Sequence, residues 1–451
     1  MSVVGYNTMK HLIISILAIL FLCSSLKAQN YIVSSSGLDD FNTIQKAADT
    51  AEAGDTVYIK AGTYAERVFF FKSGTATNPI VFKNFEQDKV IVDGIDINWT
   101  VNWGGLFDIS EVSHIYISGI EIINSKHAGI FLDNAEHISI DNCKTHNTYS
   151  SGIGVWYAKH ISITNNEVSL ACNDGGEECI TISDSSDVKV NHNEVHHNGP
   201  GINGGEGIDV KGGSHDVIVS YNHVHHLRKR TGVYADAWNK HTYNIKFDSN
   251  RVHDCENVGL AVASERGGLI ENITFVNNIV YNNLDGGMAV GGWTEGTPVT
   301  SNPVEHINII NNTFYHNYND GIYIINKDAK DIKVYNNIVS QNILPSGTAH
   351  QVYVEHTPLA EVDIRSNLID GLSGQYGQIN EILAKPLFTD APQADFRLQP
   401  SSLAINNGIQ SNHSLLDYVK NSRNHDGIWD IGAYEYRVDM AFLIPILYLF
   451  M

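Results

Sequence analysis

The sequence predicts an all-β protein: a single right-handed parallel β-helix, in which each coil of the chain adds a strand to the sheets of a solenoid. Asparagines recur through the middle of the chain at intervals of 25 to 34 residues. Segments that alternate apolar and polar side chains precede them, as in residues 161–166. The alternation indicates strands, and the period indicates stacked repeats. The recurring residues are Asn166, Asn193, Asn222, Asn250, Asn278, Asn312, Asn337 and Asn367.

The N-terminal residues 1–28 have the layout of a secretory signal peptide. Met9-Lys10-His11 precedes an apolar run over residues 12–22, and Ala28 offers a cleavage site. We therefore expect a secreted or periplasmic protein. The apolar tail over residues 439–451 has no assigned role and is too short to span a bilayer, so no membrane span is expected.

Residues 29–110 are expected to form an N-terminal cap and the first coils. Apolar residues at helical spacing over residues 41–53 predict a short amphipathic helix that covers the open end of the solenoid. The regular β-helix with its functional groove is expected over residues 111–383. The period is lost over residues 384–438, which are therefore expected to form an irregular closing segment.

One strand of each repeat follows a glycine, and together these strands predict one surface of the protein. Apolar side chains alternate toward a narrow core, and the residues between them point outward. One outward row is expected to contain Trp156, Ser183, Lys211, Asp236, Ala263 and Gly291. The neighbouring row is expected to contain Gly154, Thr181, Asp209, Tyr234, Ala261 and Ala289. Reactive side chains in the middle coils, with small residues beside them, indicate an open groove.

Composition limits the class of partner. The formal net charge of −21 argues against a nucleic-acid ligand, which requires a basic surface. A monomer is expected. Among the cysteines, Cys172 and Cys179 flank a short loop and are expected to form a disulfide in an oxidising compartment, whereas Cys143 and Cys255 are expected to be buried free thiols.

The first candidate catalytic residue is Lys211. Strand geometry places it beside Asp209 and over Asp236 of the next coil, while Tyr234 lies over Asp209. Elimination at a uronic acid needs a base, a proton donor and positive charge at the carboxylate, and Lys211 or Tyr234 could act as base or acid. The alternative for Lys211 is an exposed ion pair of little energetic value.

A basic cluster lies close to these residues in the sequence. Arg228 and Arg230 belong to a dense basic run just before Tyr234, and Arg266 follows one coil later. Positive side chains near the groove of an acidic protein indicate an anionic glycan as substrate. The alternative is a solvated basic turn.

Two segments resemble those of secreted bacterial β-helix proteins: residues 54–58, Gly-Asp-Thr-Val-Tyr, and residues 430–436, Asp-Ile-Gly-Ala-Tyr-Glu-Tyr. The resemblance covers nearly the whole mature chain and implies polysaccharide lyases or glycoside hydrolases. Glu206 and Lys211 are similar to the glutamate and base lysine of alginate- and chondroitin-type lyases. Where that family has an acid arginine, this chain has Tyr234 and Asp236, a departure that also admits an oligosaccharide dehydratase.

Paired carboxylates support an alternative assignment as a glycoside hydrolase. Asp236 with Glu265, or Asp209 with Asp236, could flank a scissile glycosidic bond. Residues 234–238 also resemble a catalytic strand of β-helix xylosidases. A further alternative is a calcium site made by Glu206, Asp209 and Asp236; no other cofactor is expected.

Aromatic residues suggest how a sugar would be bound. Trp156, Trp238 and Trp293 fall on or just past the outward rows, where exposed indoles can stack on sugar rings. His226 could reach the groove as an acid or base. These residues also fit a third class of function, a glycan-binding β-helix without catalysis.

Overall fold

The computed structural model describes residues 28–100, 103–173, 176–201, 204–293, 301–343, 349–372, 380–423 and 427–437. The expected signal peptide, except for Ala28, and the apolar tail lie outside the described residues. The side chain of Trp293 is also outside them, although its backbone is described. Within the described part of the chain, no helix is long and apolar enough to cross a membrane.

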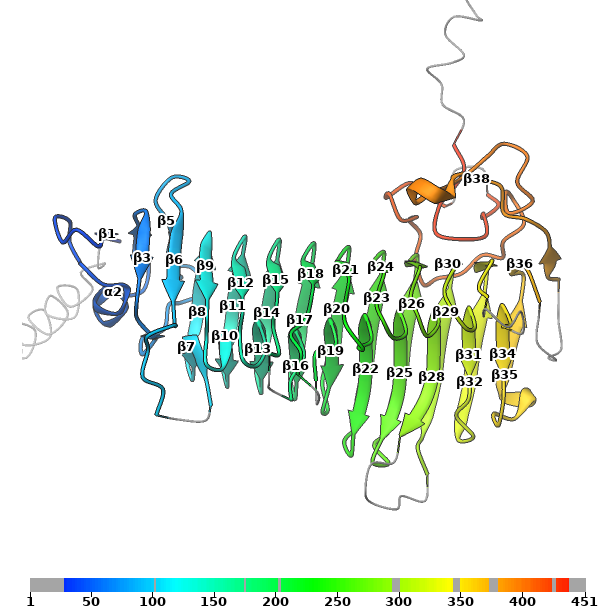
Figure 1. Ribbon diagram of the computed structural model, residues 1–451, viewed down its shortest axis with the longest axis horizontal. Helices are drawn as coiled ribbons and strands as arrows, with labels where there is room; N and C mark the ends of the chain where they lie inside the picture. The colour runs from blue at the N-terminus through cyan, green and yellow to red at the C-terminus, as the bar shows by residue number, and fades with distance from the viewer. Residues whose placement is uncertain are drawn as a thin grey trace, which may run out of the picture.

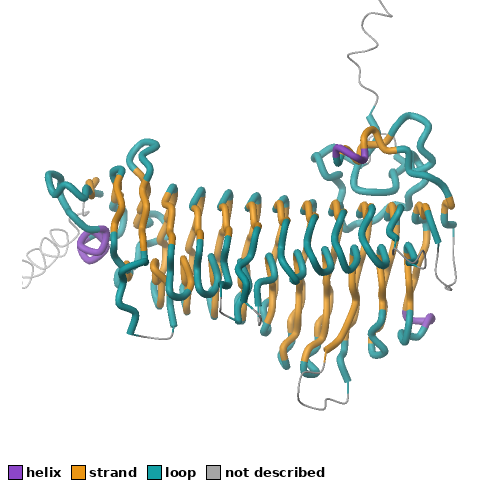
Figure 2. Tube along the Cα trace, in the orientation of Figure 1, coloured by secondary structure: helices purple, strands orange, loops and turns teal. Residues whose placement is uncertain are grey.

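Three long parallel sheets run the length of an elongated molecule, as the sequence predicts (Figures 1 and 2). Each coil contributes one strand to sheet C, then one to sheet A and one to sheet B. Sheet A contains β1 (Asn30–Val33), β2 (Thr56–Ile59), β5 (Ile80–Asn84), β8 (Ser113–Ser118), β11 (Glu136–Asp141), β14 (Lys159–Thr164), β17 (Ser186–Asn191), β20 (His215–Ser220), β23 (Thr242–Asp248), β26 (Ile270–Val276), β29 (Val304–Ile310), β32 (Ala329–Tyr335) and β35 (Val362–Arg365).

Sheets B and C complete the solenoid. Sheet B contains β3 (Gly62–Tyr64), β6 (Val90–Asp93), β9 (Ile120–Ile123), β12 (Lys144–His146), β15 (Glu167–Ser169), β18 (Glu194–His196), β21 (His223–His225), β24 (Arg251–His253), β27 (Ile279–Tyr281), β30 (Thr313–Tyr315), β33 (Ile338–Ser340), β36 (Leu368–Asp370) and β37 (Ile382–Leu383). Sheet C contains β4 (Val68–Phe69), β7 (Gly105–Ser110), β10 (Ala128–Asp133), β13 (Ile153–Trp156), β16 (Ile180–Ser183), β19 (Ile208–Lys211), β22 (Val233–Trp238), β25 (Leu260–Glu265), β28 (Met288–Trp293), β31 (Ile322–Ile324) and β34 (Val352–Val354).

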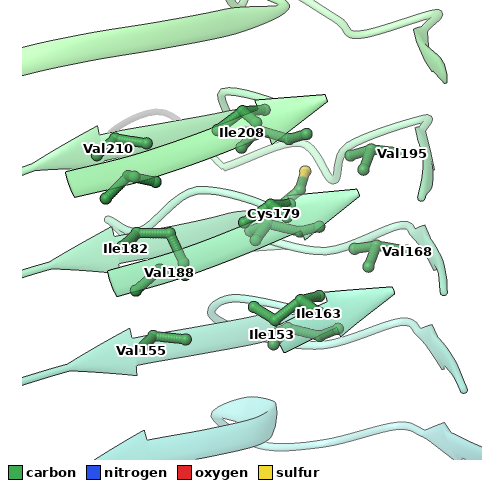
Figure 3. Close-up of a cluster of buried hydrophobic side chains, with 14 of the residues drawn as sticks. Ile153, Val155, Ile163, Val168, Cys179, Ile182, Val188, Val195, Ile208 and Val210 are labelled. Carbon is green, nitrogen blue, oxygen red and sulfur yellow. The ribbon is translucent and has the colours of Figure 1, made fainter. Parts of the chain in front are cut away.

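The core of the solenoid consists of apolar side chains stacked coil upon coil. Ile153, Ile180 and Ile208 occupy the same position in three consecutive coils and are fully buried. Figure 3 shows Ile153 and Ile208 together with other buried side chains of the same coils, such as Val155, Ile182 and Val210. Burial of aliphatic groups at about 25 cal/mol per Å² is the main force that stabilises such a core.

The recurring asparagines form a continuous hydrogen-bonded ladder at the turn between sheets A and B. Each side-chain amide donates to the side-chain oxygen of the next asparagine at 2.9–3.0 Å. The same nitrogen donates to a backbone carbonyl of the preceding coil, such as Val219 O for Asn250. The ladder therefore satisfies buried polar groups of the tight turns, which explains why this turn requires asparagine.

The predicted N-terminal helix is present but shorter than residues 41–53. Helix α2 (Ile44–Thr50) begins after Thr43, whose hydroxyl accepts a hydrogen bond from Lys46 N at 3.3 Å. Phe41 instead forms a parallel bridge with Val33, and Ala51 has a ψ of 137° that ends the helix. The helix buries Ile44, Ala47 and Ala48 against the first coil.

The C-terminal segment folds back against the last coils (Figure 1). It contains η2 (Ala391–Gln393) and the antiparallel pair β38 (Phe388–Asp390) and β39 (Asp395–Leu398), while η1 (Leu359–Glu361) lies earlier, before β35. The fully buried Arg423 joins the segment to the solenoid. Its guanidinium is 2.6 Å from Glu435 Oε1 and donates to Asn277 Oδ1 at 2.7 Å.

The disulfide expected between Cys172 and Cys179 is absent. Both side chains are fully buried free thiols, as are Cys143 and Cys255. Burial, together with contact with Cys179, raises the pKa of Cys172 well above its ordinary value. The paired thiols therefore pack as apolar groups in the core.

Candidate active-site cleft

The register of sheet C places the two outward rows as the sequence predicts. In one row, Thr181 pairs with Asp209, Asp209 with Tyr234, and Tyr234 with Ala261. In the other row, Ser183 pairs with Lys211, and Asp236 pairs with Ala263. The alternation of β19, β22 and β25 thus presents reactive side chains on one face of three adjacent coils.

A cleft of about 580 Å³ opens over these strands. Its residues come from the strands themselves and from the loops that enter and leave them. They are Gly176, Glu177, Glu178, Ser183, Asp184, Glu206, Asp209, Lys211, Gly212, Arg230, Thr231, Tyr234, Asp236, Trp238, Lys240, Asn257 and Glu265. Carboxylates outnumber basic groups in this lining.

Lys211 is held by Glu178, which is not among the site residues predicted from the sequence. Its Nζ lies 2.6 Å from Glu178 Oε1 and 3.9 Å from Glu177 Oε2. The alternative of an exposed ion pair is not observed, because the direct partner of Lys211 is Glu178, whose side chain is 6% exposed. Burial works to lower the pKa of Lys211, but Glu178, Asp209 and Asp236 raise it well above its ordinary value, so the amine remains protonated.

A repeated offset could have revealed Glu178. Glu206 lies three residues before Asp209, and Glu178 lies three residues before Thr181. Because Thr181 and Asp209 are register partners, the two glutamates enter adjacent coils at equivalent positions. The feature that identifies Glu178 in the sequence is its distance of three residues from the outward strand position. Its distance from Glu206 is not informative, because the length of the intervening loops varies from coil to coil.

Asp209 and Asp236 are almost completely buried, with 2% and 5% of their surface exposed. Burial and repulsion from Asp236 raise the pKa of Asp209 well above its ordinary value. Burial and repulsion from Glu265 do the same for the pKa of Asp236. Asp236 accepts a hydrogen bond from Trp238 N at 3.0 Å, whereas Asp209 Oδ1 is buried without a hydrogen-bond partner among the described residues.

Tyr234 and Glu265 form the second pair in the cleft. The Tyr234 hydroxyl donates to Glu265 Oε1 at 2.6 Å, across one coil. Burial, with repulsion from Asp236 and Glu265, raises the pKa of Tyr234 well above its ordinary value, so the phenol is neutral. The structure therefore brings together all five predicted catalytic residues: Lys211, Tyr234, Asp236, Asp209 and Glu265.

The tryptophans have different environments. Trp238 lines the cleft, and the guanidinium of Arg266 lies 4.0 Å from its ring centroid. Trp293 is the backbone register partner of Glu265, in the same row as Trp238. The prediction of an exposed Trp156 is wrong: it is 7% exposed, and its ring packs 5.1 Å from Phe131, outside the cleft lining.

Of the predicted basic ligands, Arg230 alone lines the cleft. Its Nη1 lies 3.8 Å from Glu206 Oε1. The backbone of Arg228 is bound to the side chain of Asn198, and its own side chain is outside the cleft lining because the turn directs it to the exterior. Arg266 is outside the cleft lining and contacts the ring of Trp238, which lines the cleft.

His226 is also outside the cleft lining. Its Nδ1 lies 2.7 Å from His225 Nδ1, and its ring stacks on His197 at 5.1 Å. These contacts hold it at the end of sheet B, before the chain crosses to sheet C. The expectation that His226 contributes to the groove is therefore wrong.

The acidic lining is suited to a divalent cation. Carboxylate oxygens are the ligands that calcium prefers, and the unpaired Asp209 Oδ1 beside Asp236 is an available ligand atom. Burial and repulsion from Glu178 raise the pKa of Glu206. The charged form of this third carboxylate is therefore also destabilised in the absence of a cation. The donor set of Glu206, Asp209 and Asp236 fits calcium in its chemistry. The described side-chain groups whose metal-binding atoms all lie within 4.8 Å of one another do not include this triad.

The protein is a right-handed parallel β-helix, and parts of its sequence are similar to β-helix families and to a pectate lyase. Residues 28–177 match the family described as "Pel9A-like, right handed beta helix region". Residues 203–304 match the family described as "Right handed beta helix region".

Two curated proteins are similar in sequence. The uncharacterized protein YwoF of Bacillus subtilis (strain 168) is 28% identical over 420 residues, which cover 81% of this chain and 88% of YwoF. Pectate lyase PEL9 of Emericella nidulans is 30% identical over 127 residues, which cover 24% of this chain and 31% of that protein. The second match thus spans about a third of the pectate lyase.

Solved structures share the fold at low sequence identity. Pectate lyase Pel9A has a TM-score of 0.52 at 14% identity, covering 92% of this chain and 97% of that one. XylC in complex with xylose has a TM-score of 0.57 at 13% identity, with 90% and 98% covered. The A-module of mannuronan C-5 epimerase AlgE4 from Azotobacter vinelandii has a TM-score of 0.50 at 14% identity, with 76% and 94% covered.

Proposed function

We propose that this protein is a secreted or periplasmic enzyme that acts on a uronic-acid-containing polysaccharide or oligosaccharide by β-elimination, as a lyase or as an oligosaccharide dehydratase. The observation that carries the proposal is the protonated Lys211 among buried carboxylates in the cleft, with the Tyr234–Glu265 pair beside it. The resemblance to pectate lyases supports the same reaction class.

In this reaction the carbon next to the substrate carboxylate loses a proton, and the C4–oxygen bond breaks as a C4=C5 double bond forms. Lys211 supplies positive charge toward the carboxylate, where negative charge develops. Glu265 accepts the proton from carbon. Tyr234, already hydrogen-bonded to Glu265, donates its proton to the departing oxygen and regains one from Glu265, so the proton count balances.

A calcium ion held by Glu206, Asp209 and Asp236 would supply additional positive charge toward the substrate carboxylate. The remaining cleft residues position the sugar. Trp238 offers an aromatic face, and Arg230 offers a cation at the entrance of β22.

The test is an ultraviolet and mass measurement on uronate-containing oligosaccharides, with wild-type protein and the Lys211→Ala variant. We expect a new conjugated double bond that is lost in the variant. Cleavage without added water identifies a lyase, and loss of one water without cleavage identifies a dehydratase. The exposed Lys189 on sheet A provides the control variant Lys189→Ala, which should match wild type.

Products that gain water and carry no double bond would refute elimination and favour hydrolysis by Asp236 and Glu265. XylC, with its bound xylose, shares the fold and makes this the second candidate. Binding without any product would instead identify a glycan-binding module.

A further inference from the structure

Six histidines gather on sheet B and in the turns that follow it, on three consecutive coils. They are His196, His197, His223, His225, His226 and His253. The register pairs His196 with His225 and His225 with His253, and these rings stack at 5.1 and 5.2 Å. None of the six lines the cleft, so the histidine cluster is separate from the candidate active site.

Two of these histidines converge on one carboxylate. Glu194 Oε1 lies 3.2 Å from His225 Nε2 and 3.9 Å from His223 Nδ1. One potential ligand atom from each of the three residues lies within 4.8 Å of the other two. Glu194 and His223 are register partners on β18 and β21, so the backbone fixes their separation.

The opposite ring nitrogens of both histidines are held by other histidines. His223 Nε2 lies 2.7 Å from His253 Nε2, and His225 Nδ1 lies 2.7 Å from His226 Nδ1. A second hydrogen bond of this kind orients an imidazole and selects its tautomer in metal sites. His253 is itself oriented by Asp254, whose Oδ2 is 2.6 Å from His253 Nδ1.

Stacking alone does not account for the arrangement. His137 and His160 also stack, at 4.5 Å, but Glu136 Oε1 lies 4.0 and 3.9 Å from their nitrogens, farther than Glu194 Oε1 lies from His225 Nε2. In another place a histidine stacks on a tyrosine of the next coil, as His215 does on Tyr243 at 4.7 Å. That pair presents one imidazole, and no carboxylate joins it in a three-residue ligand group. In the histidine cluster the nitrogens instead face one another and Glu194.

We propose that Glu194, His223 and His225 bind a divalent transition-metal ion, for which Zn²⁺ is the probe. Two imidazoles and a carboxylate are a ligand set that zinc accepts, with the fourth position open to water or to a further ligand. The ion would join the coils of β18 and β21 on the face away from the cleft.

The experiment is calorimetric titration of the full chain with ZnCl₂, after treatment with a chelator and without a polyhistidine tag. We expect saturable binding with one strong site and a rise in the thermal unfolding midpoint. His225→Ala should weaken zinc affinity at least tenfold, and the control His215→Ala should change it less than twofold. Glu194→Gln, at an exposed position, provides a second variant that keeps the histidine stack intact.

Three results would overturn the assignment: no saturable zinc binding, equal affinity in wild type and both site variants, or weakening by His253→Ala but not by His225→Ala. The last result would place the ion instead at the adjacent group of His226, His253 and Asp254. None of these outcomes depends on catalysis, so the proposed function is tested separately.

Discussion

Lys211 Nζ lies 2.6 Å from Glu178 Oε1, and the two residues come from neighbouring coils 33 positions apart in the sequence. Only 6% of the Glu178 side chain and 20% of the Lys211 side chain are exposed. The ion pair places one positive charge among the carboxylates of the cleft, and it is the interaction on which the proposed chemistry depends.

The ion pair between Lys211 and Glu178 should stabilise the folded protein. Lys211→Met leaves Glu178, Asp209 and Asp236 without their cation, so we expect the free energy of unfolding to fall by about 3 kcal/mol. In the double variant with Glu178→Gln, the loss should be smaller than in Lys211→Met alone. Denaturant titration of the four proteins measures the coupling, and additive losses would contradict a direct pair.

Stability should depend on pH through the buried aspartates. Their pKa values in the folded state are raised above those in the unfolded state, so the folded protein binds more protons. The contribution of these two aspartates to stability is therefore fully present below about pH 4 and is lost as pH rises through the raised values. Asp209→Asn should reduce the fall in the thermal unfolding midpoint between pH 5 and pH 8. The midpoints are measured with a chelator present, so that no divalent cation contributes. Parallel curves for wild type and variant would contradict this account.

Calcium should counter the same repulsion. Added calcium is expected to raise the unfolding midpoint of wild type at pH 8, because an ion that binds only the folded state stabilises it. The Asp209→Asn and Asp236→Asn variants should lose most of this rise. His225→Ala is the matched control and should retain it, since the histidine cluster lies outside the cleft. An equal rise in all variants would place calcium elsewhere.

Tyr234→Phe tests the proton donor. It removes the hydroxyl that donates to Glu265 at 2.6 Å and leaves the ring in place. We expect turnover on the identified substrate to fall by about 100-fold or more, with a small change in KM. The circular dichroism spectrum should match wild type. Full turnover in this variant would exclude Tyr234 as the donor.

The asparagine ladder should be essential to the stability of the solenoid. Asn250 Oδ1 accepts hydrogen bonds from both Asn222 N and Asn222 Nδ2 at 3.0 Å, and Asn250 is fully buried. Asn250→Ala leaves these donors unpaired, which should cost about 3 kcal/mol. Denaturant unfolding measures the loss. Asn42→Ala, at an exposed position, should leave stability within about 0.5 kcal/mol of wild type.

The repeat pattern was sufficient to predict the fold and much of the site. Because strand side chains alternate strictly and coils stack in register, the order of residues along the chain predicts which of them share a face. This reasoning correctly placed Asp209 over Thr181 and under Tyr234. The recurring asparagines also marked the position of the buried turn at which the ladder forms.

The loops between sheets B and C follow no such rule. Their lengths and paths differ from coil to coil. The offset from the strand could identify Glu178 as a residue of the cleft, but periodicity could not show that it contacts Lys211 or that His226 faces away from the cleft. The same limit applies to Trp156, because its ring packs 5.4 Å from that of Trp103, in the loop before β7, as well as against Phe131.

By itself, the sequence determined the solenoid, its register and the two outward rows, because local alternation and a constant period are properties of the linear chain. Tertiary structure alone decided the side-chain contacts around the rows, such as Lys211 with Glu178, the state of the cysteines and the convergence of His223 and His225 on Glu194. The physical reason is that side-chain contacts across irregular loops depend on loop path and rotamer, which the repeat does not encode.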